Sequence, residues 1–329
     1  MTRRLTASRR PMPALAGVRH QVAEVGGLRL HYADAGPADA PPVLLVHGFP
    51  QHWYAWRRVV PLLAGDFRLL CLDLPGFGWS EGAPDRWSTA ARAADLVGFL
   101  DALELESAAL LAHDWGAWAG FLACARWPER FDAHLALNMV HLWPERRDTL
   151  ACAWRFWYTL ALEWPPVGRT VLRHWPAFTR HLLRRGLVDR SALDPAELAE
   201  YAGAAREPLA ALAGESVHRA FVADDLGALR RKEFHALRLP TPTLVLAGGR
   251  DPVIPPRLLS GGAEFCDDLR VETVPDTGHQ LPAERPELVA ARARALFAGR
   301  AGGGGTQDGR AGGGRAGGGG TRGGRTHSG

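Results

Sequence analysis

Short apolar runs, separated by turns and amphipathic stretches, fill roughly the first 140 positions of the chain. His20–Val25 and Leu28–Asp34 alternate apolar and polar residues around Gly26-Gly27, which predicts a β-hairpin. Continuous apolar runs, typical of strands buried on both faces, follow at Val43–Val46, Phe67–Leu72, Ala108–Ala112 and Ala133–Leu137.

Two stretches between these runs have helical periodicity. Ser88–Leu103 begins with a serine suited to cap a helix, and Gly116–Trp127 directly follows a predicted strand. Alternation of strands and helices is typical of a mostly parallel sheet with helices on both of its faces. The sequence therefore predicts an α/β fold.

The strand pattern stops between residues 142 and 238, where the chain has helical patterning broken at Pro165-Pro166 and Asp194-Pro195. It returns afterwards, with two predicted strands and a final helix at Thr243–Ala247, Arg270–Val274 and Glu287–Phe297. We interpret residues 142–238 as a helical lid inserted into an α/β core of residues 18–141 and 239–298.

The net charge of +4 belongs to the chain ends. Residues 299–329 carry five Arg and one Asp, and the first ten residues carry four Arg and no acid, so residues 11–298 sum to −4. We therefore expect no nucleic-acid partner for the core. Sixteen of the last 31 residues are Gly, which predicts a disordered tail, and residues 1–17 are expected to form a flexible basic leader.

Missing signals narrow the class of protein further. The sequence has no apolar run of 18 residues and no signal-peptide pattern, so we expect a cytoplasmic protein without a membrane partner. The four Cys form no CxxC pair, which predicts reduced thiols and no metal site. The sequence indicates no cofactor and leaves a homodimer open.

A candidate nucleophile lies where a predicted strand meets a predicted helix, in the run Ala112-His113-Asp114-Trp115-Gly116-Ala117. A nucleophile elbow is a tight turn that needs small residues around the nucleophile, and Ala112, Gly116 and Ala117 meet that need. The elbow position itself holds Asp114 in place of a serine. Because Asp also caps helices, this motif alone leaves both roles open.

A candidate oxyanion hole follows the first buried run, at His47-Gly48-Phe49-Pro50. A loop in this position can donate a backbone N–H to a developing oxyanion, and the N–H of the residue after the nucleophile can donate a second. His47, Phe49 and Trp115 are therefore candidate substrate-binding residues.

Two further polar residues follow predicted strands late in the core. Asp251 lies in Gly248-Gly249-Arg250-Asp251-Pro252 and His279 in Asp276-Thr277-Gly278-His279. Each of them alone also fits a turn or a surface loop. Together with Asp114 they follow the chain order nucleophile, acid, histidine, which predicts a catalytic triad.

The chain resembles the epoxide hydrolases of the α/β-hydrolase fold in the runs His47–Arg57, Asp73–Ser80 and His113–Ala117, and more loosely over residues 18–298. The resemblance implies an α/β-hydrolase fold and a cofactor-free reaction of water with a small apolar epoxide. Asp114 would open the epoxide and form an ester. Water activated by the pair His279 and Asp251 would then hydrolyse that ester to a diol.

The resemblance also implies two lid tyrosines that hold the epoxide oxygen. Tyr158, ahead of Pro165-Pro166, falls where the first is expected. The second usually precedes an Arg, and this sequence has His218-Arg219 there, while the surroundings of Tyr201 do not match. Tyr158 and His218 are thus the implied proton donors. With a reference pKa near 6.5, His218 would speed ring opening as the pH falls.

Other classes of protein compete with this interpretation. A haloalkane dehalogenase shares the Asp nucleophile and the Trp after it, but usually has Asn where Phe49 stands. A fluoroacetate dehalogenase has Arg where Trp115 stands, and a further hydrolase activity also stays open. A non-catalytic binding module on a hydrolase scaffold usually lacks a triad member, and here all three positions are filled.

Overall fold

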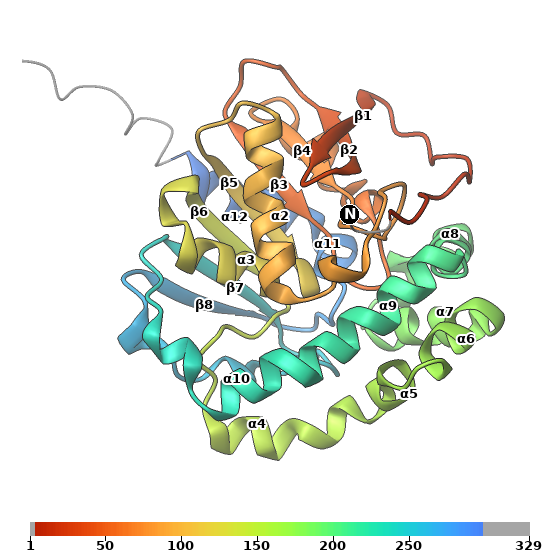
Figure 1. The fold of residues 1–329 in the computed structure, drawn as a ribbon. Helices are drawn as coiled ribbons and strands as arrows, with labels where there is room; N and C mark the ends of the chain where they lie inside the picture. The colour runs from red at the N-terminus through yellow and green to blue at the C-terminus, as the bar shows by residue number, and fades with distance from the viewer. Residues whose placement is uncertain (1–3, 299–329) are drawn as a thin grey trace, which may run out of the picture.

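One eight-stranded sheet runs through the computed structural model, which describes residues 4–298 except for the side chain of Tyr158 (Figure 1). The strand order is β1-β2-β4-β3-β5-β6-β7-β8. The strands are β1 (Val18–Val25), β2 (Leu28–Ala35), β3 (Pro42–Val46), β4 (Arg68–Leu72), β5 (Ala108–His113), β6 (Phe131–Leu137), β7 (Thr243–Gly248) and β8 (Leu269–Val274). Each predicted strand is confirmed to within two residues at either end.

The strand directions bring the predicted site residues to one edge of the sheet. β2 is antiparallel to both β1 and β4, whereas β3 to β8 pair in parallel. The carboxyl ends of parallel strands share an edge, and this is where open α/β sheets place their ligands. The loops after β3, β5, β7 and β8 carry the four predicted motifs and therefore converge.

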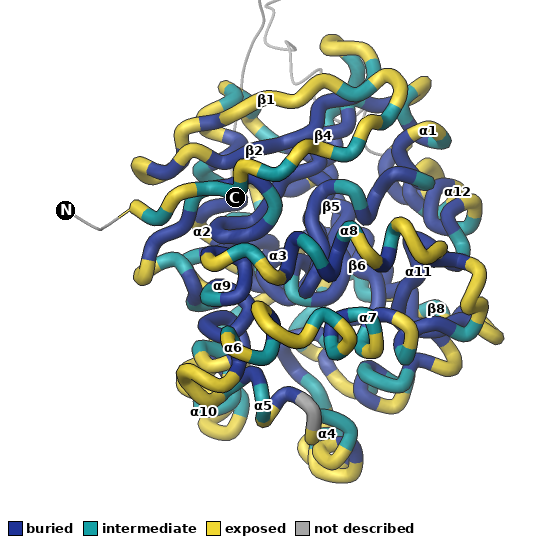
Figure 2. Tube along the Cα trace, turned by 90° about the vertical axis from the view of Figure 1, so that its right-hand side faces the viewer, coloured by how far each residue is buried: buried dark blue, intermediate teal, exposed yellow. Residues whose placement is uncertain are grey.

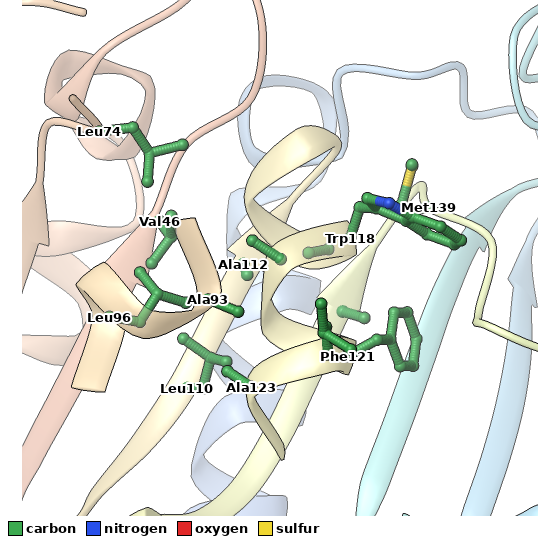
Figure 3. Close-up of a cluster of buried hydrophobic side chains, with 14 of the residues drawn as sticks. Val46, Leu74, Ala93, Leu96, Leu110, Ala112, Trp118, Phe121, Ala123 and Met139 are labelled. Carbon is green, nitrogen blue, oxygen red and sulfur yellow. The ribbon is translucent and has the colours of Figure 1, made fainter. Parts of the chain in front are cut away.

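Helices cover both faces of the sheet, and each face has its own apolar cluster. Successive side chains along a strand point to opposite faces and so belong to different clusters. Val46 and Leu110 pack with α2 (Thr89–Ala102) and α3 (Trp115–Arg126), as Figure 3 shows. Leu45 and Leu111 point to the opposite face. That face is covered by α1 (Val60–Leu63), α11 (Leu281–Glu284) and α12 (Pro286–Phe297).

Residues 142–238 enter between β6 and β7 and contain only helices and turns, so we call this segment the helical insertion. Its helices are α4 (Arg146–Cys152), η4 (Ala153–Thr159), α5 (Leu160–Glu163), α6 (Val167–His174), α7 (Pro176–Arg185), η5 (Arg190–Ala192), α8 (Pro195–Ala205), α9 (Pro208–Ala220), the π-helical turn η6 (Phe221–Asp225), α10 (Leu226–Arg230) and η7 (Glu233–Ala236). In Figure 1 they lie along the lower and right sides of the sheet. No helix in residues 4–298 is long and apolar enough to cross a bilayer.

The described part of the predicted leader makes contacts with the rest of the chain. The Leu5 backbone N–H donates to the Gly82 carbonyl at 2.8 Å. The Arg10 guanidinium pairs with Glu200 of α8 at 2.8 Å, and the Arg10 carbonyl accepts from the Trp79 indole at 2.8 Å. These contacts depend on tertiary approach, which composition does not report. Residues 1–3 and the predicted tail at 299–329 lie outside the described residues.

Gly116 fixes how closely helix α3 approaches strand β3. A Cβ at this position would lie 2.5 Å from the His47 carbonyl oxygen and 2.6 Å from that of Val46. Both atoms belong to backbone that the sheet holds in place. The elbow therefore tolerates no side chain here, as the small-residue pattern predicted.

We expect Gly116→Ala to lower the free energy of unfolding by about 1–3 kcal/mol, the usual cost of overpacking a well-packed interior. Gly65→Ala is the matched control because nothing lies within 4 Å of the Cβ it would add. Urea unfolding of the two variants and the parent chain measures the difference. Equal stability of Gly116→Ala and the parent would contradict the close approach.

Candidate active site

Asp114 is held in a strained backbone conformation at the junction of β5 and α3. Its φ is +51° and its ψ is −127°, a region that side-chain-bearing residues rarely occupy. Although it stands at the N-cap position of α3, its side chain makes no capping hydrogen bond. The geometry thus favours a nucleophile elbow over a helix cap.

Two backbone N–H groups face the Asp114 carboxylate. The Phe49 N–H donates to Oδ1 at 2.9 Å, and the Trp115 N–H helps to lower the pKa of the same carboxylate. A Cβ on Gly48 would lie 2.3 Å from the Asp114 Cβ, so only glycine lets this loop come so near. A backbone donor at this carboxylate, with a second N–H beside it, is the arrangement that an oxyanion hole requires.

His279 connects the two carboxylates of the predicted triad. Its Nδ1 lies 2.8 Å from Asp251 Oδ2, and its Nε2 lies 3.3 Å from Asp114 Oδ2. The structure therefore brings Asp114 together with two residues that lie more than a hundred positions further along the chain. The exposed fractions of Asp114, Asp251 and His279 are only 8%, 3% and 6%.

The charges in this arrangement reinforce one another. Burial raises the pKa of Asp114, but the hydrogen bond and charge of His279 outweigh it, so the pKa ends well below its usual range. Burial lowers the pKa of His279, yet the charges of Asp251 and Asp114 and their hydrogen bonds raise it overall. Asp114 is thus ionised and His279 protonated at neutral pH.

Asn138 is a positioning residue that the motifs missed. Its Nδ2 donates to Asp251 Oδ2 at 2.9 Å and to the Gly278 carbonyl at 3.1 Å. The other Asp251 oxygen accepts the N–H groups of Val253 and Ile254, at 2.7 and 3.0 Å. Because Asn138 directly follows β6, its place at the end of a parallel strand was the signal that could have found it.

The helical insertion contacts the loop that carries His279. The His279 N–H donates to the Gly186 carbonyl at 2.6 Å. Glu284 binds both sides of this contact: its Oε1 accepts the Gly278 N–H at 3.0 Å, and its Oε2 accepts the Val188 and Asp189 N–H groups at 2.9 Å. A buried carboxylate therefore ties the histidine loop to the insertion.

His47 lies beside the site without an open ring nitrogen. Its Nδ1 donates to the Gly48 carbonyl at 3.0 Å, and its Nε2 accepts the Leu74 N–H at 3.1 Å. Burial lowers the pKa of His47 to about 4, so the ring is neutral. The predicted substrate-binding role is thereby replaced by a positioning role, in which His47 orders the loop that presents Phe49.

Phe49 and Trp115 line the site with apolar surface. Both side chains are partly buried, and both rings contact His218, with centroid distances of 4.7 and 5.2 Å. The Trp115 indole also packs edge-on against Phe221, at 5.2 Å. The guanidinium of the buried Arg92 lies 5.6 Å from the indole centre. These rings leave an apolar surround for the Asp114 carboxylate.

His218 reaches the site from α9, but its proton points away from it. Nδ1 lies 2.7 Å from the Gly214 carbonyl, which only accepts, so the proton sits on Nδ1 and the Nε2 of the neutral ring is an acceptor. Burial lowers the pKa of His218 to about 4. The prediction that His218 donates a proton and titrates near its reference pKa therefore fails, because burial and the carbonyl one turn back fix a neutral tautomer.

The structure describes the two tyrosines of the insertion to different extents. The backbone of Tyr158 lies in η4, and its side chain is outside the described residues. Tyr201 is fully buried in α8, where its hydroxyl accepts from Arg57 at 3.1 Å within a separate apolar cluster. Tyr201 is thus not part of the site. Within residues 4–298, no cluster of three His, Cys, Asp or Glu side chains is arranged to hold a metal ion.

Known proteins resemble this chain in sequence and in fold. The profile of the alpha/beta hydrolase fold family matches residues 41–286. The chain is 27% identical over 285 residues to the AB hydrolase superfamily protein YfhM of Bacillus subtilis, covering 83% of this chain and 96% of that protein. It is 30% identical over 305 residues to epoxide hydrolase A of Mycobacterium tuberculosis, covering 82% and 94%. The crystal structure of epoxide hydrolase A from Mycobacterium thermoresistibile superposes with a TM-score of 0.73 at 25% identity, covering 86% of this chain and 98% of that one.

We expect Asp114→Asn to lower the pKa of His279, because the substitution removes one of the two negative charges that raise it. The decrease should be on the order of one pH unit or more. NMR titration of the imidazole resonances measures it. Asp276→Asn is the control. Asp276 lies three positions before His279 in the sequence, and its side chain is exposed. Equal His279 titration in Asp114→Asn and the parent would contradict the coupling.

Proposed function

The chain belongs to the alpha/beta hydrolase fold family, and from that premise we propose that it is an epoxide hydrolase that forms a covalent ester on Asp114. The observation that carries this proposal is a carboxylate at the elbow that accepts the Phe49 N–H, faces the Trp115 N–H and lies against a His–Asp pair. A carboxylate needs no base to become a nucleophile, since it is ionised at neutral pH. The relationship to epoxide hydrolase A is consistent with this chemistry.

Ring opening uses the Asp114 oxygen that faces His279. Oδ1 is held by the Phe49 N–H, so attack on an epoxide carbon falls to Oδ2. The new Oδ2–carbon bond forms as the ring carbon–oxygen bond breaks, and the electron pair moves to the epoxide oxygen. That oxygen takes up a proton from a donor in the site, which leaves a hydroxyalkyl ester on Asp114.

Ester hydrolysis uses the other half of the arrangement. Esterification removes the negative charge of Asp114 and with it one cause of the raised pKa of His279. His279 then returns its proton more readily to the donor that was spent in ring opening, and its free Nε2 can take a proton from water. The water oxygen adds to the Asp114 carboxyl carbon, and the Phe49 N–H stabilises the charge that develops on Oδ1, with the Trp115 N–H beside it. Collapse breaks the bond between the carboxyl carbon and Oδ2, so Oδ2 leaves with the alkyl group and takes a proton from His279 to complete a vicinal diol. The new carboxyl group then gives its proton to His279, which restores the starting charges.

The helical insertion acts in this proposal as a lid that keeps the site dry. Its residues Gly186 and His218 contact the triad loop and the oxyanion loop. We assign the epoxide proton to Tyr158 in η4, because a phenol with a pKa near 10 stays protonated at neutral pH. Neutral His218 can accept a hydrogen bond at Nε2 and thereby orient a donor or a water.

We expect His279→Gln to accumulate the ester, since the first step does not need a base. The variant is incubated with styrene oxide and, separately, with 1-bromobutane, and intact-mass spectrometry measures the adduct. Parent enzyme in the same two assays should release diol and no bromide. His279→Gln/Asp114→Asn is the control and should show no adduct.

Two results would contradict this assignment. Bromide release with no diol would make the enzyme a dehalogenase, the nearest rival, in which the Trp115 indole would bind halide. An unmodified mass with full turnover would remove His279 from the mechanism.

We expect Tyr158→Phe to slow ester formation by about 2–4 kcal/mol in activation free energy, the usual effect of losing a main donor to a developing oxyanion. Tyr32→Phe, a buried tyrosine of strand β2, is the matched control. The parent rate should stay level from pH 9 to pH 5, because the pKa values of Asp114 and His218 both lie below that range. Stopped-flow alkylation rates test both statements. A rate that rises through pH 6.5 and becomes flat in His218→Phe would restore His218 as the donor.

A further inference from the structure

The outer edge of the helical insertion carries a ridge of exposed apolar side chains. Its members are Leu150, Trp154, Trp157, Leu160 and Trp164, whose exposed fractions range from 60% to 70%. They are spaced four, three, three and four residues apart along α4, η4 and α5, with Trp164 directly after α5. We call these five residues the ridge.

Helix geometry places the ridge on one face. Residues three apart are eclipsed in a 3₁₀ helix, and residues four apart share a face of an α-helix, so the spacing from Leu150 to Leu160 follows the local helix type. Trp164 follows at the C-cap of α5, where the backbone is extended. Cys152, Thr159 and Leu162, which lie between ridge positions, are buried. Three exposed Trp side chains in one row are unusual for a surface exposed only to water. The ridge therefore fits a contact with another surface.

The segment of the chain that contains the ridge is rich in positively charged residues. Residues 146–185 contain eight Arg and only two acids. Both acids are engaged within the chain, since Asp148 binds Arg257 and Ser260 and Glu163 binds Thr159. Arg155 lies 5.0 Å from the ring centre of Trp154. The Arg residues are Arg146, Arg147, Arg155, Arg169, Arg173, Arg180, Arg184 and Arg185.

This charge argues against a second copy of the chain as the occupant of the ridge. A twofold interface is self-complementary, so it would press one Arg-rich segment against another, and like charges oppose association. An acidic surface with an apolar layer beneath it complements both features. Trp rings prefer the boundary between the polar and apolar zones of a bilayer, and Arg residues are drawn to anionic headgroups.

We propose that the ridge docks the protein on the surface of an anionic lipid bilayer. The contact is peripheral: Trp side chains enter the headgroup boundary, and the flanking Arg side chains pair with lipid phosphates. Figure 2 shows the exposed positions of α4 at the foot of the molecule, on its outside. This proposal departs from the sequence-based expectation of no membrane partner, because a search for long apolar runs does not detect a short exposed ridge.

Vesicle flotation tests the proposal with the full chain. Vesicles are made of phosphatidylcholine alone or of an equal mixture with phosphatidylglycerol. The parent protein should float with the mixed vesicles only, and high salt should weaken binding. Trp154→Ser/Trp164→Ser and, separately, Arg146→Glu/Arg147→Glu should each reduce the bound fraction by about ten-fold. Melting temperatures of the variants check that they remain folded.

Control substitutions change exposed residues away from the ridge. Val22→Ser/Val271→Ser alters exposed apolar side chains on β1 and β8, and Arg29→Glu/Arg270→Glu alters exposed charges on β2 and β8. Both controls should bind as the parent does. Equal binding of ridge variants and parent would assign the contact to other basic residues, such as those of the chain ends, and overturn the proposal.

Two further outcomes would also overturn it. One is a parent protein that does not float with either vesicle. The other is a parent that is dimeric in light scattering and becomes monomeric in Trp154→Ser/Trp164→Ser, which would make a second copy the occupant. Because the assay measures no turnover, its result is separate from the test of epoxide hydrolysis.

Discussion

Two carboxylates hold one imidazole between them in the protein interior, and the surrounding structure serves to make that arrangement stable. Asp251 and Asp114 lie 2.8 and 3.3 Å from the two ring nitrogens of His279. Buried charges are costly unless they are paired and hydrogen-bonded. Here the Phe49, Val253 and Ile254 N–H groups and the Asn138 amide supply the remaining bonds. Neither carboxylate therefore depends on His279 alone.

The fold could be predicted from the sequence because its strands are short, strongly apolar and regularly spaced. Asp114, Asp251 and His279 could be singled out for a related reason: each follows a predicted strand, and parallel strands bring their ends to one edge. Asn138 follows a strand as well, but no motif marks it. Glu284 and Gly186 could not be predicted from the sequence, because they act through contacts between segments more than ninety residues apart.

His218 shows where a sequence argument about protonation fails. The position in the chain suggested a donor, and the reference pKa suggested titration near neutral pH. The helix instead places a carbonyl against Nδ1, and burial removes the charged form from the ordinary pH range. Both effects come from packing around α9. Packing also decides the behaviour of the leader and the ridge. Composition alone predicted neither the contact of Arg10 with Glu200 nor the exposure of the three Trp side chains.

The two carboxylates differ in a way that suits a two-step reaction. Asp251 is held by three donors besides His279, so it fixes the ring and its tautomer. In the proposed reaction Asp114 loses its charge when the ester forms, which is the moment when a base is required. An imidazolium that stabilises the nucleophile before attack thus becomes a neutral base after it, with no movement of the ring. A serine at the elbow would be uncharged beforehand, so it would not hold His279 protonated in the free enzyme. The aspartate therefore supplies the nucleophile and also the charge that sets the protonation state of its own partner.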